Sequence, residues 1–121
     1  MSQFDHEKLR VYQRALSFVA WAEQLLTELP KNLAGHNQLD RASTSIPLNI
    51  AEGNGKFHSA DRCRFFDIAR GSALECAACL DVLVAKNRLT TERVSTGRAI
   101  LLETVSMLVG LIRANSEARS A

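Results

Sequence analysis

Residues 43–55 read STSIPLNIAEGNG, a stretch that places a proline inside an otherwise helical pattern of apolar residues. Ile46 and Ile50 lie four residues apart, the spacing of one helix face, and continue an apolar row that begins upstream. Pro47 removes a backbone donor and crowds the preceding turn, so we expect the helix to bend just before it. The two glycines that close the stretch are residues often found just past a helix end. The stretch therefore predicts the second half of an amphipathic helix over residues 36–53.

Three further segments repeat their apolar residues at steps of three and four. Pro30 ends the first of them, and Thr90 or Thr91 can cap the last. No segment alternates apolar and polar residues as a half-buried strand would. Helices are predicted at about residues 6–29, 36–53, 59–87 and 91–115. Four helices with short connections predict an all-α fold, an antiparallel up-down-up-down four-helix bundle formed by one domain, residues 1–121.

The first predicted helix carries two apolar rows. The main row is Leu9, Tyr12, Leu16, Val19, Ala22, Leu26 and Leu29, and the row beside it is Val11, Phe18, Trp21 and Leu25. A helix in a lone bundle rarely needs a second buried face. We therefore predict that Phe18 and Trp21 form an interface with another subunit.

Bulk composition indicates a soluble protein. The 121 residues are 46% hydrophobic and 23% charged, and the polar first ten residues lack the apolar core of a signal peptide. No apolar run approaches the roughly 18 residues needed to cross a bilayer. We expect a cytoplasmic protein without membrane contact, whose cysteines Cys63, Cys76 and Cys79 remain thiols.

Catalytic and metal-binding patterns have little support. Cys76 and Cys79 have the spacing of a zinc or redox half-site, but they lie mid-helix on an apolar row without a second pair, which favours buried structural thiols. The EGNGK segment lacks the preceding strand and the Lys-Ser/Thr of a phosphate loop. An enzyme using Glu52 or Cys76 has only its residue types in its favour. We expect no catalytic activity, no cofactor and no metal.

A polar row runs along the second predicted helix. Its members lie at steps of four, four and three and share a face, namely Arg41, Ser45, Asn49 and Glu52. They could form a ligand or RNA site, or they could pair with Glu75 or Arg70 of the third helix. We favour a structural polar network that includes Glu75, because polar groups inside bundles need partners.

Several of these residues also form a recognisable set. The motif Ser45-Ile46-Pro47-x-Asn49-Ile50-Ala51-Glu52-Gly53 follows Arg41-Ala42 and is itself followed by Ile68-Ala69, Gly71-Ser72 and Glu75. Together with the start Leu9-x-Val11-Tyr12-Gln13, this set resembles the family called four helix bundle proteins, whose founding members are encoded in intervening sequences of bacterial 23S ribosomal RNA genes. The likeness spans about the first 85 residues, but the first connection is shortened and Ala77, Ala78 and Cys79 replace polar residues.

The resemblance implies a ring-like homopentamer that is not an enzyme. A related branch comprises the accessory proteins of diversity-generating retroelements, whose basic pentamers bind nucleic acid and a reverse transcriptase. The net charge of this chain is only +2, a weak electrostatic footprint by composition. We predict phosphate contacts by cations that an antiparallel bundle gathers at one end, namely Lys8, Arg10, Arg14, Lys56, Arg62 and Arg64.

The expected function is therefore that of a non-enzymatic, oligomeric bundle that binds RNA or DNA or scaffolds a nucleoprotein complex of an intervening sequence or mobile element. Its partners would be its own copies, a nucleic acid and, for a retroelement, a reverse transcriptase or another element-encoded protein. The alternative is a protein-protein interaction module without nucleic-acid binding. Oligomer mass with and without RNA would separate the two.

Overall fold

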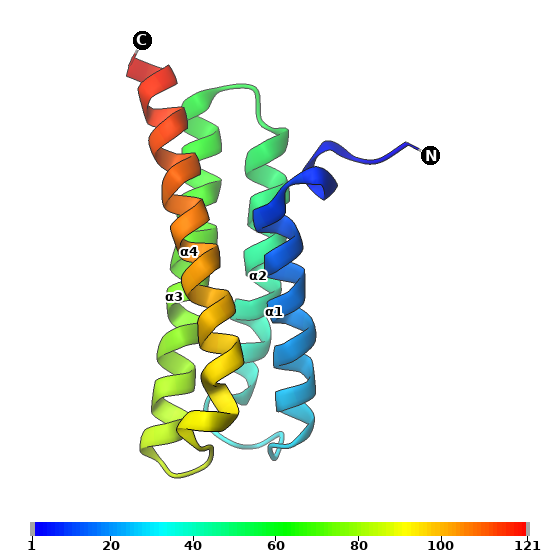
Figure 1. Ribbon diagram of the computed structural model, residues 1–121, viewed down its shortest axis with the longest axis vertical. Helices are drawn as coiled ribbons and strands as arrows, with labels where there is room; N and C mark the ends of the chain where they lie inside the picture. Colours follow the sequence, from blue (N-terminus) through cyan, green and yellow to red (C-terminus); the bar gives the residue numbers. More distant parts are fainter. Residues whose placement is uncertain (1, 121) are drawn as a thin grey trace.

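The computed structural model describes residues 2–120, with side chains described through residue 116, and this part of the chain forms four α-helices and one 3-10 turn without any strand. The elements are η1 (Asp5–Lys8), α1 (Arg10–Thr27), α2 (His36–Gly55), α3 (Ser59–Ala85) and α4 (Thr91–Ser120). The prediction of an all-α fold with four helices is confirmed. The chain reverses at each connection, so that α1 and α3 run opposite to α2 and α4 (Figure 1).

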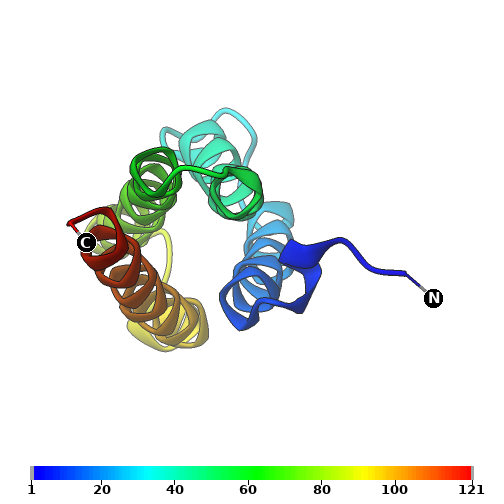
Figure 2. The ribbon, with the colours of Figure 1, turned by 90° about the horizontal axis from the view of Figure 1, so that it is seen from above.

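Each helix packs against the helices that precede and follow it, and α4 also packs against α1. Viewed from above, the four helices surround one central core (Figure 2). The largest fully buried side chains come from all four helices and are Phe18, Leu25, Leu39, Ile46, Ile50, Phe66, Leu80, Leu83, Leu101 and Leu108. The apolar stripe of every helix is thus turned toward a shared interior.

The start of the first helix differs from the prediction of residue 6. Residues Asp5–Lys8 form a 3-10 turn, and Leu9 has extended backbone angles (φ −75°, ψ 127°) that separate this turn from α1. The ring of His6 lies 4.8 Å from the ring of Tyr12, and the Asn54 side chain donates to the Asp5 carboxylate at 2.9 Å. These contacts hold the turn against α1 and α2.

The buried face of α1 combines residues of both predicted rows. Val11, Phe18 and Leu25 from the adjacent row are buried, and so are Ala22 and Leu26 from the main row. Leu16, from the main row, is 44% exposed, and Trp21, from the adjacent row, is half-buried. Both rows have helical spacing, so the residues of each row that are buried depend on where the neighbouring helices lie.

Glycines mark two close helix contacts in the bundle. Gly53 lies inside α2, which ends at Gly55. A Cβ atom on Gly53 would lie 2.9 Å from the ring of Phe66 on α3, so the close approach of the two helices requires a glycine there. Gly97 on α4 faces the ring of Trp21 on α1 in the same way. Gly71 on α3 has no atom within 4 Å of such a position. The close approaches therefore involve Gly53 and Gly97 and not Gly71.

A side-chain hydrogen bond caps the start of α4 but not the start of α3. The Thr90 side chain accepts a hydrogen bond from the Arg93 amide at 3.1 Å, which confirms a predicted cap of α4. Ser59 is the first residue of α3, and His58 occupies the cap position without a side-chain bond. α4 extends to Ser120, beyond the predicted end at residue 115.

α4 is more apolar than a single bundle requires. Its segment Thr91–Ser116 is long and apolar enough to cross a membrane by length and composition. An 18-residue window of this segment has a mean hydropathy of 1.4, and 28% of that window is buried. Val94, Leu101 and Leu108 face the core, and Glu103 forms ion pairs with α1. The composition thus fits a packed helix that also presents apolar surface.

Candidate nucleic-acid interface

The start of α1, the α2–α3 loop (residues 56–58) and the final turns of α4 lie at one end of the bundle, which we call the basic end (Figure 1). Two contacts join these segments. Asn54 near the end of α2 donates to Asp5, and Arg62 on α3 donates to the Asn115 side chain on α4, each at 2.9 Å. Cations that are far apart in the sequence are therefore neighbours.

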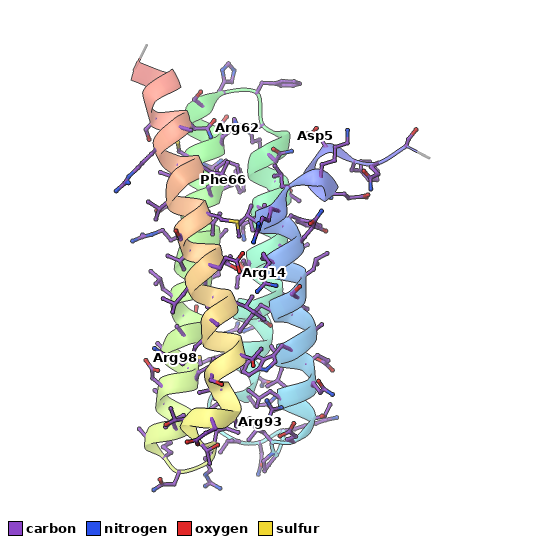
Figure 3. The ribbon with its side chains drawn as sticks, viewed as in Figure 1. Asp5, Arg14, Arg62, Phe66, Arg93 and Arg98 are labelled. Atoms are coloured by element: carbon purple, nitrogen blue, oxygen red, sulfur yellow. The ribbon has the colours of Figure 1, made fainter. Side chains whose placement is uncertain are left out.

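Arg62 is part of the structural frame of the basic end. Its Nη1 atom donates to the carbonyl oxygens of Asn54 at 2.7 Å and Lys56 at 3.1 Å, and its Nε atom donates to Asn115. Its guanidinium carbon lies 5.7 Å from the centre of the Phe66 ring (Figure 3). The last carbonyl groups of a helix have no hydrogen-bond donor within the helix, and the Arg62 guanidinium donates to such groups here. Arg62 thus closes α2, and these bonds occupy the donors that we expected to contact phosphate.

Arg10 and Arg14 are also engaged within the subunit. Both donate to the carboxylate of Glu103 on α4, at 2.8 and 2.9 Å. The hydrogen bond from Arg10, followed by the charges of Arg14 and Arg10, lowers the pKa of Glu103 below its ordinary value. The two arginines therefore join α1 to α4, although the Arg10 side chain remains 77% exposed.

The remaining three predicted phosphate contacts form longer ion pairs within the subunit than Arg10 and Arg14 do, or none among the described residues. Lys8 is exposed and forms no ion pair within the described residues. Lys56 lies 3.5 Å from Glu52, and Arg64 lies 4.0 Å from Asp61, as exposed pairs one helical turn apart. Exposed ion pairs of this kind contribute little and exchange readily with other partners. Lys8, Lys56 and Arg64 are thus cations of the basic end that have no close ion pair among the described residues.

The polar row of α2 does not form one network. The Ser45 hydroxyl lies 2.8 Å from the Ser72 hydroxyl on α3, and the Asn49 amide donates to the Ser45 hydroxyl and carbonyl at 2.9 Å. Glu52 pairs with Lys56 instead of α3. Arg41 and Glu75 are exposed, without an ion pair within the described chain. The prediction holds for Ser45 and Asn49 and is wrong for the charged members, because solvent satisfies them.

The predicted subunit contact by Phe18 is wrong. Phe18 is 0% exposed inside its own subunit, so no neighbouring copy can reach it. Trp21 is half-buried, packs on Phe18 at a ring distance of 5.6 Å, and covers Gly97. Arg93 lies 5.6 Å from the Trp21 ring and pairs with Glu28 (Figure 3). Trp21 thus fills the joint between α1 and α4.

Exposed leucines occur on two sides of the bundle instead. Leu74 on α3 and Leu102 on α4 are 45% and 69% exposed and line a shallow groove of about 90 Å³, which we call the α3–α4 face. On the other pair of helices, Leu16 and Leu48 are 44% and 61% exposed and define the α1–α2 face. Figure 2 shows these two helix pairs on opposite sides of the core.

The cysteines are not activated nucleophiles. Cys76 is buried, and its burial raises the pKa of the thiol to about 12, with smaller contributions from Cys79 and Glu75. Burial and the nearby Glu75 charge also raise the pKa of Cys79, which is half-buried beside a cleft of about 280 Å³. Both thiols therefore stay protonated near neutral pH. The prediction of buried structural thiols is confirmed for Cys76, whereas Cys79 is only half-buried.

Comparison with protein families finds a match to the 23S rRNA-intervening sequence protein model over residues 7–110. The chain belongs to this family. The matched region begins before α1 and extends into the second half of α4, so it contains most of the bundle. The resemblance expected from the SIPLNIAEG motif is thereby confirmed.

A solved structure similar to this intervening-sequence family member is that of a protein of unknown function from the S23 ribosomal protein family of Bacteroides thetaiotaomicron. The TM-score is 0.79 with 26% identity, and the alignment covers 84% of this chain and 97% of the other. Comparison with curated proteins gives no match. The similarity therefore confirms the fold and the family without assigning an activity.

Sequence reasoning missed two features of this intervening-sequence family member. Glu103 holds two arginines, and a signal was present, since an acid amid apolar residues of a bundle helix needs a partner. Phe57 in the α2–α3 loop is 99% exposed, and the signal was an aromatic residue between Lys56 and His58 just after two glycines. The basic end therefore carries a solvent-exposed aromatic ring.

Proposed function

We propose that this member of the 23S rRNA-intervening sequence protein family is a non-catalytic, ring-forming bundle that binds RNA or DNA through its basic end. The observation that carries the proposal is the pair of apolar faces on opposite sides of the bundle. Leu16 and Leu48 belong to one face, and Leu74 and Leu102 belong to the other. Exposed apolar surface of this kind marks interaction sites in soluble proteins.

Two different faces favour a head-to-tail assembly. When the α3–α4 face of one copy meets the α1–α2 face of the next, each copy keeps one unused face until the ring closes. Leu102 on α4, which is 69% exposed, supports this arrangement because it offers apolar surface outside the core. We propose five copies, which is the number that the resemblance implies. The family match confirms the resemblance itself.

A ring would also strengthen nucleic-acid binding. Each copy contributes Lys8, Lys56 and Arg64 at the same end, and five copies at +2 each would carry +10. Repeating a weak site on a rigid ring raises the overall affinity through effective concentration. This accounts for binding despite the small net charge of one subunit. We propose that the protein acts in the cytoplasm without a cofactor or metal.

Light scattering with and without RNA tests both parts of the proposal. We expect a mass near five subunits for the protein alone and a larger complex when RNA is added at about 50 mM salt, with binding falling steeply as salt rises. A monomer would contradict the ring. A ring that ignores RNA and DNA at low salt would contradict the nucleic-acid part.

A second candidate is a protein-interaction module without nucleic-acid binding. The engagement of Arg10, Arg14 and Arg62 inside the subunit favours it, because these cations were half of the predicted phosphate contacts. The partner would be a reverse transcriptase or another protein encoded by the same genetic element. A ring that captures such a protein in the absence of any nucleic acid would support this candidate.

A further inference from the structure

Phe57 has no role within its own subunit. It lies in the loop of residues 56–58 between α2 and α3, and its side chain is 99% exposed. The large apolar side chains of the core stabilise the fold by leaving water. The Phe57 ring, in contrast, stays in solvent. A fully exposed aromatic ring at the tip of a bundle is therefore available to a partner.

The loop holds Phe57 in this exposed position. Arg62 donates to the carbonyl of Lys56, the residue directly before Phe57, at 3.1 Å and to the carbonyl of Asn54 at 2.7 Å. The Asn54 side chain is itself bonded to Asp5 at 2.9 Å. These bonds fix the loop backbone on both sides of Asn54 and directly before Phe57. The ring is thus presented on a braced loop, which lowers the entropic cost of binding.

Two cations close to this loop in the sequence, Lys56 and Arg64, lie over the ring of Phe65. Nζ of Lys56 lies 5.1 Å and Cζ of Arg64 lies 4.5 Å from the centre of the Phe65 ring, so both charges gather at the first turns of α3. Their acidic neighbours Glu52 and Asp61 are exposed and pair with them only at 3.5 and 4.0 Å. One exposed ring and two replaceable cations therefore share the tip of the basic end.

We propose that Phe57 stacks on an unpaired base of a single-stranded nucleic acid, while Lys56 and Arg64 contact the phosphates on either side of that base. An exposed aromatic ring beside cations is the combination that single-strand binding surfaces use. A base inside a duplex cannot offer its face to the ring, so the site selects single strands. This inference rests on the proposed function and specifies its ligand.

The test compares binding of an unstructured single-stranded RNA and a matched duplex by fluorescence anisotropy. Phe57→Ala should weaken single-strand binding roughly tenfold, the effect of losing one stacked base, and leave duplex binding unchanged. Its salt dependence should keep the slope of the unaltered protein, whereas Lys56→Gln should lower that slope. Phe57→Trp should retain binding. Val82→Ala, which removes another exposed apolar side chain at the opposite end of the bundle, is the matched control and should not change either affinity.

The outcomes separate this inference from the proposed function. If the unaltered protein binds single strands and Phe57→Ala binds them equally well, stacking is wrong while nucleic-acid binding stands. If the unaltered protein binds neither RNA, both are wrong. Equal weakening toward single strand and duplex, or a changed oligomer mass with unchanged RNA affinity, would assign Phe57 to the subunit frame and overturn the inference. The thermal melting of Phe57→Ala checks that the bundle remains folded.

Discussion

Trp21 on α1 covers Gly97 on α4 so closely that a Cβ atom on Gly97 would overlap its ring. The ring is held from its other sides by Phe18 and Arg93, which leaves it little room to move. The joint between α1 and α4 therefore depends on a residue without a side chain. Glu103, which holds Arg10 and Arg14, joins the same two helices nearer the basic end.

Gly97→Ala should lower the free energy of unfolding. The added methyl group forces Trp21 out of its packed position, and overpacking of this kind costs about 1–3 kcal/mol. Urea denaturation followed by circular dichroism measures the change. Gly110→Ala on the same helix is the matched control, because no atom lies within 4 Å of its Cβ position. It should be neutral or stabilising, and equal behaviour of the two variants would contradict the proposed joint.

Arg62→Lys should destabilise the basic end. A lysine cannot reproduce the planar group that serves two carbonyls and Asn115 together, so half-buried acceptors lose their donors at a cost of about 1 kcal/mol. Thermal and urea unfolding provide the measurement. Arg64→Lys makes the same change on the neighbouring exposed pair and should alter stability by less than about 0.5 kcal/mol. A smaller loss for Arg62 than for Arg64 would refute its role in closing α2.

Cys76 should react slowly with a thiol reagent in the native protein. With a pKa of about 12, roughly one thiol in ten thousand is ionised at pH 8. Labelling followed by mass spectrometry should modify Cys79 before Cys76, and all three cysteines should react after unfolding. Rapid native labelling of Cys76 would show that it is accessible.

The same thiol predicts a loss of stability in alkaline solution. In the unfolded chain Cys76 ionises near its ordinary pKa of 9.0, whereas in the folded protein it keeps its proton until about pH 12. The unfolded state therefore binds fewer protons between these values, and the free energy of unfolding falls as pH rises above 9. Cys76→Ala should show a flatter pH dependence in that range. An equally steep decline in both proteins would assign it to other groups.

The head-to-tail ring predicts how two interface variants behave together. Leu102→Glu disables the α3–α4 face and Leu48→Glu disables the α1–α2 face, so each should be a folded monomer on its own. Mixed together, they should form a heterodimer, because each supplies the face that the other lacks. Ultracentrifugation measures the masses. Ala99→Glu, at an exposed site on α4 outside the groove, should remain a ring. Dimers of either variant alone would indicate like-with-like contacts instead.

Local chemistry in the sequence was sufficient for much of this architecture. Steps of three and four between apolar residues predicted four helices, Pro30 ended the first pattern, and Thr90 capped the last helix as expected. The SIPLNIAEG motif predicted the family that the match over residues 7–110 confirms. These features depend on residues close together in the chain, so their signals can be read in order.

Tertiary structure decided which of these residues meet. Two rows of α1 have helical spacing, and only the positions of α2 and α4 determine that Phe18 is buried while Leu16 is exposed. Gly53 serves the approach of Phe66 instead of a helix end, and Arg62 joins the end of α2 to Asn115 of α4. Phe57 is exposed on a loop whose backbone Arg62 holds. Packing and hydrogen bonding between distant segments set these roles, and no local pattern contains that information.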